Sequence, residues 1–212
     1  MFSRLLILTL LCSPAAVAQT AGVDPPALKT RDTHQNLLIV ADPYLGTDRY
    51  KASFGKKSPY ESGIIGIEVY FRNDNDSPIR LNLETIRLVV SSPDADRQRL
   101  SPLSPEDVAD RMLLKAHANP TVPRRPFPFP GSGVKSGNGK TWDEEASLLR
   151  SLVLSTEVLP PHATTHGFLF FDMNHQFDAI HNSHLYIPDL TYMIEKRPLF
   201  FFEIDLGVPS AN

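Results

Sequence analysis

The chain has 212 residues, of which 42% are hydrophobic, and a formal net charge of −3 at pH 7. This length suits one domain with a proper hydrophobic core, and the mild acidity gives no electrostatic reason to expect nucleic-acid binding. Proline accounts for 19 residues, about 9% of the chain, against ~5% in an average protein. Prolines at this density divide a chain into short elements, which favours β structure with turns over a helical bundle.

The N-terminus has the form of a secretory signal peptide. Arg4 supplies a positive charge, residues 5–11 are apolar apart from Thr9, and Ala16-Val17-Ala18 is typical of a signal-peptidase site. We therefore expect cleavage after Ala18 and a secreted or periplasmic protein. The apolar run is far shorter than the ~20 residues of a spanning helix.

Cys12 is the one cysteine of the chain, and it lies within the expected signal peptide. The mature chain then has no disulfide, no thiolate nucleophile and no thiolate metal ligand. A eukaryotic secreted domain more often carries disulfides, so a bacterial envelope fits better.

The first half of the mature chain reads as β structure. Residues 19–35 predict a flexible lead-in, 36–41 a first strand, and 44–62 a loop. Residues 65–71 alternate strictly between apolar and other side chains, which indicates a strand. A turn cluster at 73–78 leads to an apolar run at 79–83, so these two runs predict an antiparallel hairpin. The apolar parity then shifts for 86–90, which indicates a bulge or bend.

Two helices are predicted in the middle of the chain. The first spans 104–118, with Ser104 as N-cap and Pro105 at the first helical position, and ends at Asn119-Pro120. The second spans about 142–150, with Thr141 as N-cap and Glu144 completing a capping box.

Strand patterns return after residue 150 and close the chain. They cover residues 152–156, 167–171, 190–194 and 200–206, and the aromatic runs 168–171 and 200–202 read as core. About seven strands and one excursion predict a single mainly β domain over 36–212. We expect an antiparallel β-sandwich with an inserted helical and Pro/Gly-rich excursion at 101–150.

Two blocks of sequence resemble secreted bacterial Ig-like domains of the telokin-like type. One is Gly66–Asp74 followed by Pro78–Leu81, and the other is Leu159-Pro160-Pro161 followed by Gly167–Phe171. The family usually has glycine after the proline, where this chain has Pro161-His162, and the 104–150 insertion is additional. The resemblance implies an Ig-like sandwich in the envelope and no particular activity.

The segment GSGVKSGNGKT, residues 131–141, suggests a phosphate-binding loop but departs from its pattern. G-x-x-x-x-G-K-[ST] requires glycine at 134, where the chain has Val134, and Gly133 is one position too early. Residues 143–145 would place three carboxylates beside a bound triphosphate. We therefore expect no nucleotide binding and no cofactor.

Five of the seven histidines lie between residues 162 and 184, which raises the possibility of a metal site. His162 and His166 follow two prolines and are expected in an extended or turn segment, about 13 Å apart and too far for one ion. His175, His181 and His184 remain as candidate ligands of an alternative metal-binding function. Loop histidines facing solvent are the simpler interpretation. The acidic turns 74–76 and 94–96 lack the glycine and glutamate of a calcium loop.

The segment 123–130, Pro-Arg-Arg-Pro-Phe-Pro-Phe-Pro, favours an extended polyproline helix that presents its side chains outward. Arg124, Arg125, Phe127 and Phe129 are therefore candidate partner-binding residues, for example toward an envelope protein. The alternative is a strap whose two phenylalanines pack back onto the domain.

The functional expectation is a non-catalytic binding or structural module of the cell envelope. The chain has no G-x-S-x-G elbow, so an enzyme is the less favoured interpretation. A metal-binding protein and a hydrolase with a site assembled by folding are the two alternatives.

Overall fold

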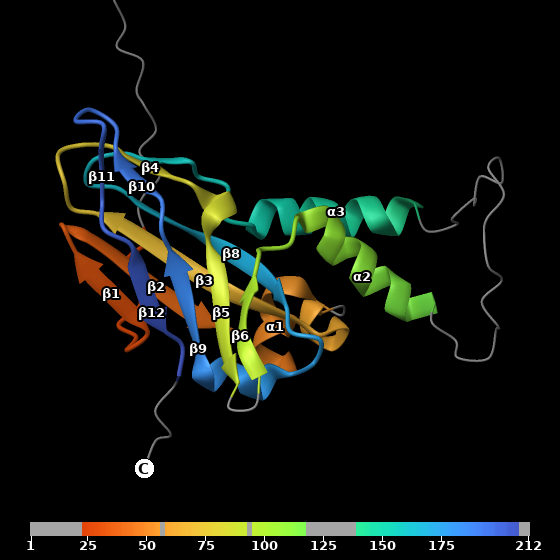
Figure 1. Ribbon diagram of the computed structural model, residues 1–212. Coiled ribbons are helices and arrows are strands. Elements are labelled where there is room, and N and C mark those ends of the chain that lie inside the picture. Colours follow the sequence, from red (N-terminus) through yellow and green to blue (C-terminus); the bar gives the residue numbers. More distant parts are fainter. Residues whose placement is uncertain (1–22, 56–57, 93–94, 118–138, 208–212) are drawn as a thin grey trace, which may run out of the picture.

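The computed structural model describes residues 23–55, 58–92, 95–117 and 139–207, and this part of the chain is mainly β (Figure 1). Its elements, in chain order, are β1 (Arg31–His34), β2 (Leu37–Pro43), α1 (Thr47–Phe54), η1 (Pro59–Ser62), β3 (Ile64–Asn73), β4 (Ile79–Leu81), η2 (Leu83–Thr85), β5 (Arg87–Ser92), β6 (Ala95–Leu100), α2 (Pro105–His117), α3 (Gly139–Leu152), β7 (Val158–Leu159), β8 (Thr164–Asp172), η3 (Phe177–Asn182), β9 (Ser183–Ile187), β10 (Leu190–Tyr192), β11 (Arg197–Pro198) and β12 (Phe202–Asp205).

The strands form three antiparallel sheets of four strands each. Their orders are β1-β2-β3-β8, β11-β10-β4-β7 and β12-β9-β5-β6. The main core lies between one face of the first sheet and the other two sheets, because it draws buried residues from all three. In Figure 1, β5, β9 and β12 accordingly pass in front of β2 and β3.

The strict alternation at 65–71 is confirmed by β3. Ile65, Ile67, Val69 and Phe71 are fully buried in the main core, so the residues between them face the opposite side of the sheet. That opposite face begins with Ile64, which belongs to a second core built with the three helices. The first sheet is therefore buried on both faces at this end.

The second core joins the helices to β3 and β8. Ile64 and the ring of Phe170 pack there against Tyr50 of α1, Val108 of α2 and Leu149 of α3. The buried hydroxyl of Tyr50 accepts a hydrogen bond from the backbone N–H of Gly66 at 2.6 Å. The helices accordingly gather at one side of the sheets, on the right in Figure 1.

The first predicted helix is confirmed, including its cap. The Ser104 Oγ accepts a hydrogen bond from the backbone N–H of Asp107 at 3.1 Å, and Val108, Ala109 and Met112 are buried on one face. The second helix begins earlier than predicted, at Gly139, so Thr141 lies inside α3 and is not its N-cap.

The predicted hairpin of residues 65–71 and 79–83 is wrong. β3 pairs with β2 on one side and β8 on the other, so neither of its edges is free for β4. The turn after β3 instead carries the chain across to the second sheet, where β4 pairs with β7 and β10. The apolar parity shift that follows reflects a bend, which is η2, a short 3-10 helix between two sheets. The register irregularity of β5 lies further on, between Val90 and Ser92.

Several elements lie where no regular structure was predicted. β1 lies within the expected lead-in and pairs with β2, α1 occupies the expected loop, and β6 and β9 complete the third sheet. The sequence patterns do not predict β1, α1 and β6, because these elements are short and rich in polar residues. They do not predict β9, because it follows directly on the 3-10 helix η3.

The strands predicted at 190–194 and 200–206 are shorter in the structure, where they are β10 and β12. Ile194 is 70% exposed because it lies beyond β10, in the turn to β11. Phe200 is 74% exposed and precedes β12, whereas Phe202 is fully buried. The alternating buried side chains that were expected from Phe200 onward therefore begin at Phe202. No helix in the described ranges is long and apolar enough to cross a membrane.

Candidate functional site

A cluster of polar and aromatic side chains surrounds Glu68 on the first sheet. Glu68 and Tyr70 face away from the main core, because they alternate with its buried residues along β3. The antiparallel register places Asp42 of β2 opposite Glu68, and His166 of β8 opposite Tyr70. Tyr44 follows β2 directly. Three segments distant in sequence therefore meet at one carboxylate.

The carboxylate of Glu68 is mostly buried and hydrogen-bonded at both oxygens. Its side chain is 13% exposed. The Tyr44 hydroxyl donates to Oε2 at 2.8 Å, and Nδ1 of His166 lies 3.1 Å from Oε1. The imidazole also stacks on the ring of Tyr70, with centroids 5.0 Å apart. Buried carboxylates need such partners, because an unpaired one is strongly disfavoured.

The two tyrosines are held in their neutral form. Burial, followed by the hydrogen bond to Glu68, raises the pKa of Tyr44 to about 12. Burial also raises the pKa of Tyr70, and the charge of Glu68 and a hydrogen bond to it add to the shift. Both hydroxyls therefore remain donors at neutral pH.

Arg49 of α1 extends the cluster toward a hollow. Its guanidinium binds both oxygens of Asp42, at 2.9 and 2.7 Å, and lies 3.9 Å from the centre of the Tyr44 ring. The hydrogen bonds that Arg49 donates to Asp42 raise the pKa of Arg49, and such a two-pronged pair fixes the arginine plane. The hollow has a volume of about 420 Å³, and residues 27–30, 42, 43, 45 and 49 line it.

The arrangement fixes the hydrogen-bonding role of His166. A carboxylate can only accept, so Nδ1 of the ring donates to Glu68 and Nε2 of the neutral ring keeps its lone pair. Nε2 forms no hydrogen bond with another described residue, and the side chain is 41% exposed. His166 therefore presents an oriented acceptor to the solvent.

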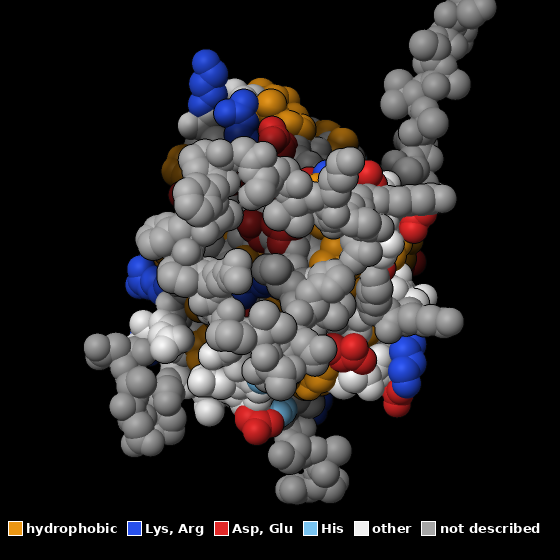
Figure 2. All heavy atoms as spheres, turned by 90° about the vertical axis from the view of Figure 1, so that its right-hand side faces the viewer, with side chains coloured by type: hydrophobic (Ala, Val, Ile, Leu, Met, Phe, Trp, Pro, Cys, Tyr) orange, Lys and Arg blue, Asp and Glu red, His pale blue; other side chains and the backbone are white. Residues whose placement is uncertain are grey.

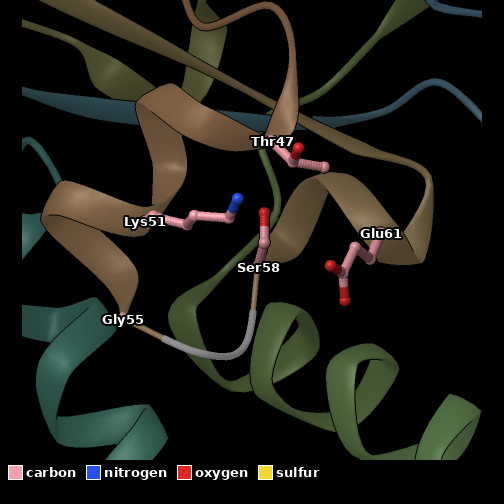
Figure 3. A pocket seen from close by; sticks show the side chains of 5 residues that line it. All are labelled: Thr47, Lys51, Gly55, Ser58 and Glu61. Atoms are coloured by element: carbon pink, nitrogen blue, oxygen red, sulfur yellow. The ribbon is translucent and has the colours of Figure 1, made fainter.

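A second hollow of about 410 Å³ lies beside α1 and is lined by Thr47, Lys51, Gly55, Ser58 and Glu61 (Figure 3). Lys51 and Ser58 point toward the same space, as a serine–lysine catalytic pair would. The hydrogen bond from Lys51 to Asp48, together with the charge of that carboxylate, raises the pKa of Lys51. Because Lys51 stays protonated, it cannot take a proton from Ser58.

The structure does not bring the three candidate metal ligands together. His175 follows β8 and packs edge-on against Phe177, His181 lies in η3, and His184 of β9 lies 3.3 Å from the carboxylate of Glu203. Within the described ranges, which include all three, no group of three His, Cys, Asp or Glu side chains is placed to hold a metal ion.

The partner-binding candidates Arg124, Arg125, Phe127 and Phe129 lie outside the described residues. Most of the glycine-rich segment also does, and its last residues, Gly139, Lys140 and Thr141, belong to the first turn of α3.

Sequence reasoning missed the Glu68 cluster. The sequence predicts an extended or turn segment at His166, which lies in the strand β8, but it does not predict the partners of this side chain. One signal was available, because Glu68 is the one charged residue in the strand run Ile64–Phe71. Its partners Tyr44 and His166 are 24 and 98 residues away in sequence, so local patterns cannot identify them.

Comparisons with known proteins give no family for this chain. No family model matches it, and no curated protein matches it. A solved structure described as a functionally unknown protein from Listeria monocytogenes EGD-e has 12% sequence identity and a TM-score of 0.34, and the match covers 74% of this chain and 70% of that one. A likeness at this level supports no conclusion about fold or function.

Proposed function

We propose that the chain is a non-catalytic binding module of the bacterial cell envelope, built as an Ig-like β-sandwich, with the Glu68 cluster as its binding surface. The signal-peptide pattern of residues 1–18 supports the envelope location. The shared core of three antiparallel sheets supports a sandwich. The Ig-like assignment has its support in the sequence resemblance.

The observation that carries the binding role is the orientation of His166 by Glu68. An exposed imidazole held at Nδ1 by a mostly buried carboxylate loses little further freedom when it binds a ligand. The Arg49–Asp42 pair and the adjacent hollow add charged and polar groups to the same surface. Such a surface suits a ligand rich in hydroxyl or amide groups.

Retention on the envelope tests this role. The mature protein is mixed with an envelope fraction that contains membranes and peptidoglycan from a Gram-negative bacterium, and the sedimented fraction is measured against envelope concentration. We expect saturable retention, weakened about tenfold by His166→Ala, since hydrogen bonds of this kind contribute about 1–2 kcal/mol. His181→Ala, which changes an exposed histidine of η3 outside the cluster, is the matched control.

Equal retention of all three proteins, or no retention of the wild type, would contradict the proposal. Pretreatment of the envelope fraction with a muramidase or with a protease then separates a glycan ligand from a protein partner.

The Glu68–His166 pair also supports a second candidate function, the hydrolase with a site assembled by folding. A histidine oriented by a carboxylate is the usual general base of such enzymes. Ester or amide hydrolysis abolished by His166→Ala, with unchanged thermal unfolding, would favour the hydrolase over the binding module.

A further inference from the structure

A hollow of about 320 Å³ lies on the small sheet β11-β10-β4-β7, apart from the Glu68 cluster. Its lining residues are Arg80, Thr191, Tyr192, Met193 and Lys196. Arg80 of β4 pairs directly with Thr191 of β10, and Met193 and Lys196 belong to the turn between β10 and β11. Two cations from different segments therefore share one hollow with a hydroxyl group.

Neither cation is neutralised within the described part of the chain. The side chains of Arg80 and Lys196 form no ion pair and no hydrogen bond with another described residue, and both residues are exposed. A third cation, Arg197, lies 4.8 Å from the centre of the Tyr192 ring. The positive charges of Arg80 and Lys196 therefore remain available to a ligand.

Two carboxylates are close in sequence to Thr191 and Lys196, and neither forms an ion pair with Arg80 or Lys196. The carboxylate of Glu195 accepts a hydrogen bond from Ser77 at 2.8 Å. Asp189 is exposed just before β10, and neither acid lines the hollow. The lining itself is therefore cationic.

Hydrogen bonds fix the positions of two residues that line the hollow, Tyr192 and Met193. Tyr192 is 5% exposed, and its hydroxyl donates to the backbone carbonyl of Gln35 at 3.0 Å. The backbone N–H of Met193 donates to the carbonyl of Pro78 at 2.9 Å, which ties the turn to β4. Lys196 has a left-handed backbone with φ of 51°, so its direction is set by the turn.

We propose that this hollow binds a phosphate group. A phosphate monoester carries ~1.5–2 negative charges at pH 7 and three acceptor oxygens, which matches two separate cations and the Thr191 hydroxyl better than the single charge of a planar carboxylate does. This site is independent of the Glu68 surface.

Two kinds of ligand carry such a phosphate group: a soluble phosphate compound and a lipid headgroup. Val158, which pairs with Arg80 across the sheet, is 42% exposed, and Ile194 at the tip of the turn is 70% exposed. In the space-filling view, basic and hydrophobic side chains stand side by side at the top of the molecule, the end at which β10 and β11 lie in Figure 1 (Figure 2). Apolar side chains beside cations suit a phospholipid surface.

Two binding measurements on the mature protein test the site and separate its sources. Inorganic phosphate is titrated into labelled protein, and backbone amide shifts are followed by NMR, with acetate as the comparison anion. Flotation with vesicles of phosphatidic acid, whose headgroup is a phosphate monoester, and phosphatidylcholine is compared with flotation of phosphatidylcholine vesicles alone. The variants are Arg80→Ala, Lys196→Ala and Ile194→Ser, with Arg99→Ala of β6 as the matched exposed-arginine control.

We expect saturable phosphate binding, centred on Thr191 and Lys196 and tighter than acetate binding. Arg80→Ala and Lys196→Ala should each weaken it about tenfold or more, whereas Arg99→Ala should not. Flotation with the anionic vesicles that requires Ile194 as well as both cations identifies a lipid headgroup, and phosphate binding without flotation identifies a soluble compound. Absence of both activities, equal affinity for acetate, or an equal loss in Arg99→Ala would overturn the proposal.

Discussion

Asn73 shows how a single residue organises one end of the molecule. Its side chain is fully buried at the end of β3, and its amide nitrogen donates to the carbonyls of Ser77 and Pro160, both at 3.0 Å. Its amide oxygen accepts from the backbone N–H of Asn75, also at 3.0 Å. One side chain therefore joins the turn after β3 to the segment after β7.

Asn73→Ala should destabilise the protein by about 3 kcal/mol, because it leaves buried carbonyls and an N–H without partners, at about 1–3 kcal/mol each. Denaturant unfolding gives the free energy. The control is Asn82→Ala, which removes an exposed amide side chain. Equal stability of the two variants would show that water replaces the Asn73 amide without cost.

Glu68 should control the ionisation of Tyr44. Because the folded pKa of Tyr44, about 12, exceeds the value of ~10 for an unfolded chain, the stability it contributes is complete below about pH 10 and is lost as the pH rises toward 12. Glu68→Gln removes the charge and should lower this pKa only in part, since burial is the larger cause.

The absorbance of tyrosinate against pH measures this shift, and subtraction of the Tyr44→Phe curve assigns it to Tyr44. An unchanged midpoint in Glu68→Gln would mean that the carboxylate does not interact with the Tyr44 hydroxyl in solution.

At the scale of elements, the outer edge of β8 is closed by the chain on either side of the helices. The backbone N–H of Leu154, after α3, donates to the carbonyl of Phe168 at 3.0 Å, and that of Leu103, before α2, donates to Phe170 at 2.8 Å. This edge is therefore not available for pairing with another strand. Gly167 permits the contact, because a Cβ there would lie 2.6 Å from the backbone of Leu154.

Gly167→Ala should push residues 153 and 154 away from β8 and destabilise the protein by about 1–3 kcal/mol, the usual cost of overpacking. The exchange of the Leu154 amide hydrogen should accelerate with it. Ser155→Ala, which changes an exposed neighbour, is expected to affect neither quantity. Unchanged amide exchange in Gly167→Ala would show that the two backbones are further apart.

The sequence predicts the features of these elements that depend on local residue patterns. The alternation in β3 and the serine cap of α2 are local, and both are confirmed. The partners of β3 are not local, because β2 and β8 already occupy both of its edges and leave β4 to another sheet. For the same reason Glu68 could be singled out in its strand, whereas its contacts with Tyr44 and His166 could not.

At the scale of the whole molecule, export is the property most open to test. The Ala16-Val17-Ala18 pattern predicts an exported protein that begins at Gln19. Intact mass of the protein recovered from the periplasm of an expressing Gram-negative host checks this, with the cytoplasmic fraction as control. A periplasmic protein that retains residues 1–18, or a purely cytoplasmic protein, would remove the support for an envelope role.

In the proposed binding role, Glu68 orients His166 toward an envelope ligand. The most direct test is a double-mutant cycle on the dissociation constant for the envelope fraction, using Glu68→Gln, His166→Ala and the double variant. If Glu68 acts through His166, each single change weakens binding, and Glu68→Gln adds nothing once His166 is absent. Full additivity of the two changes, or unaltered binding in both single variants, would contradict the claim.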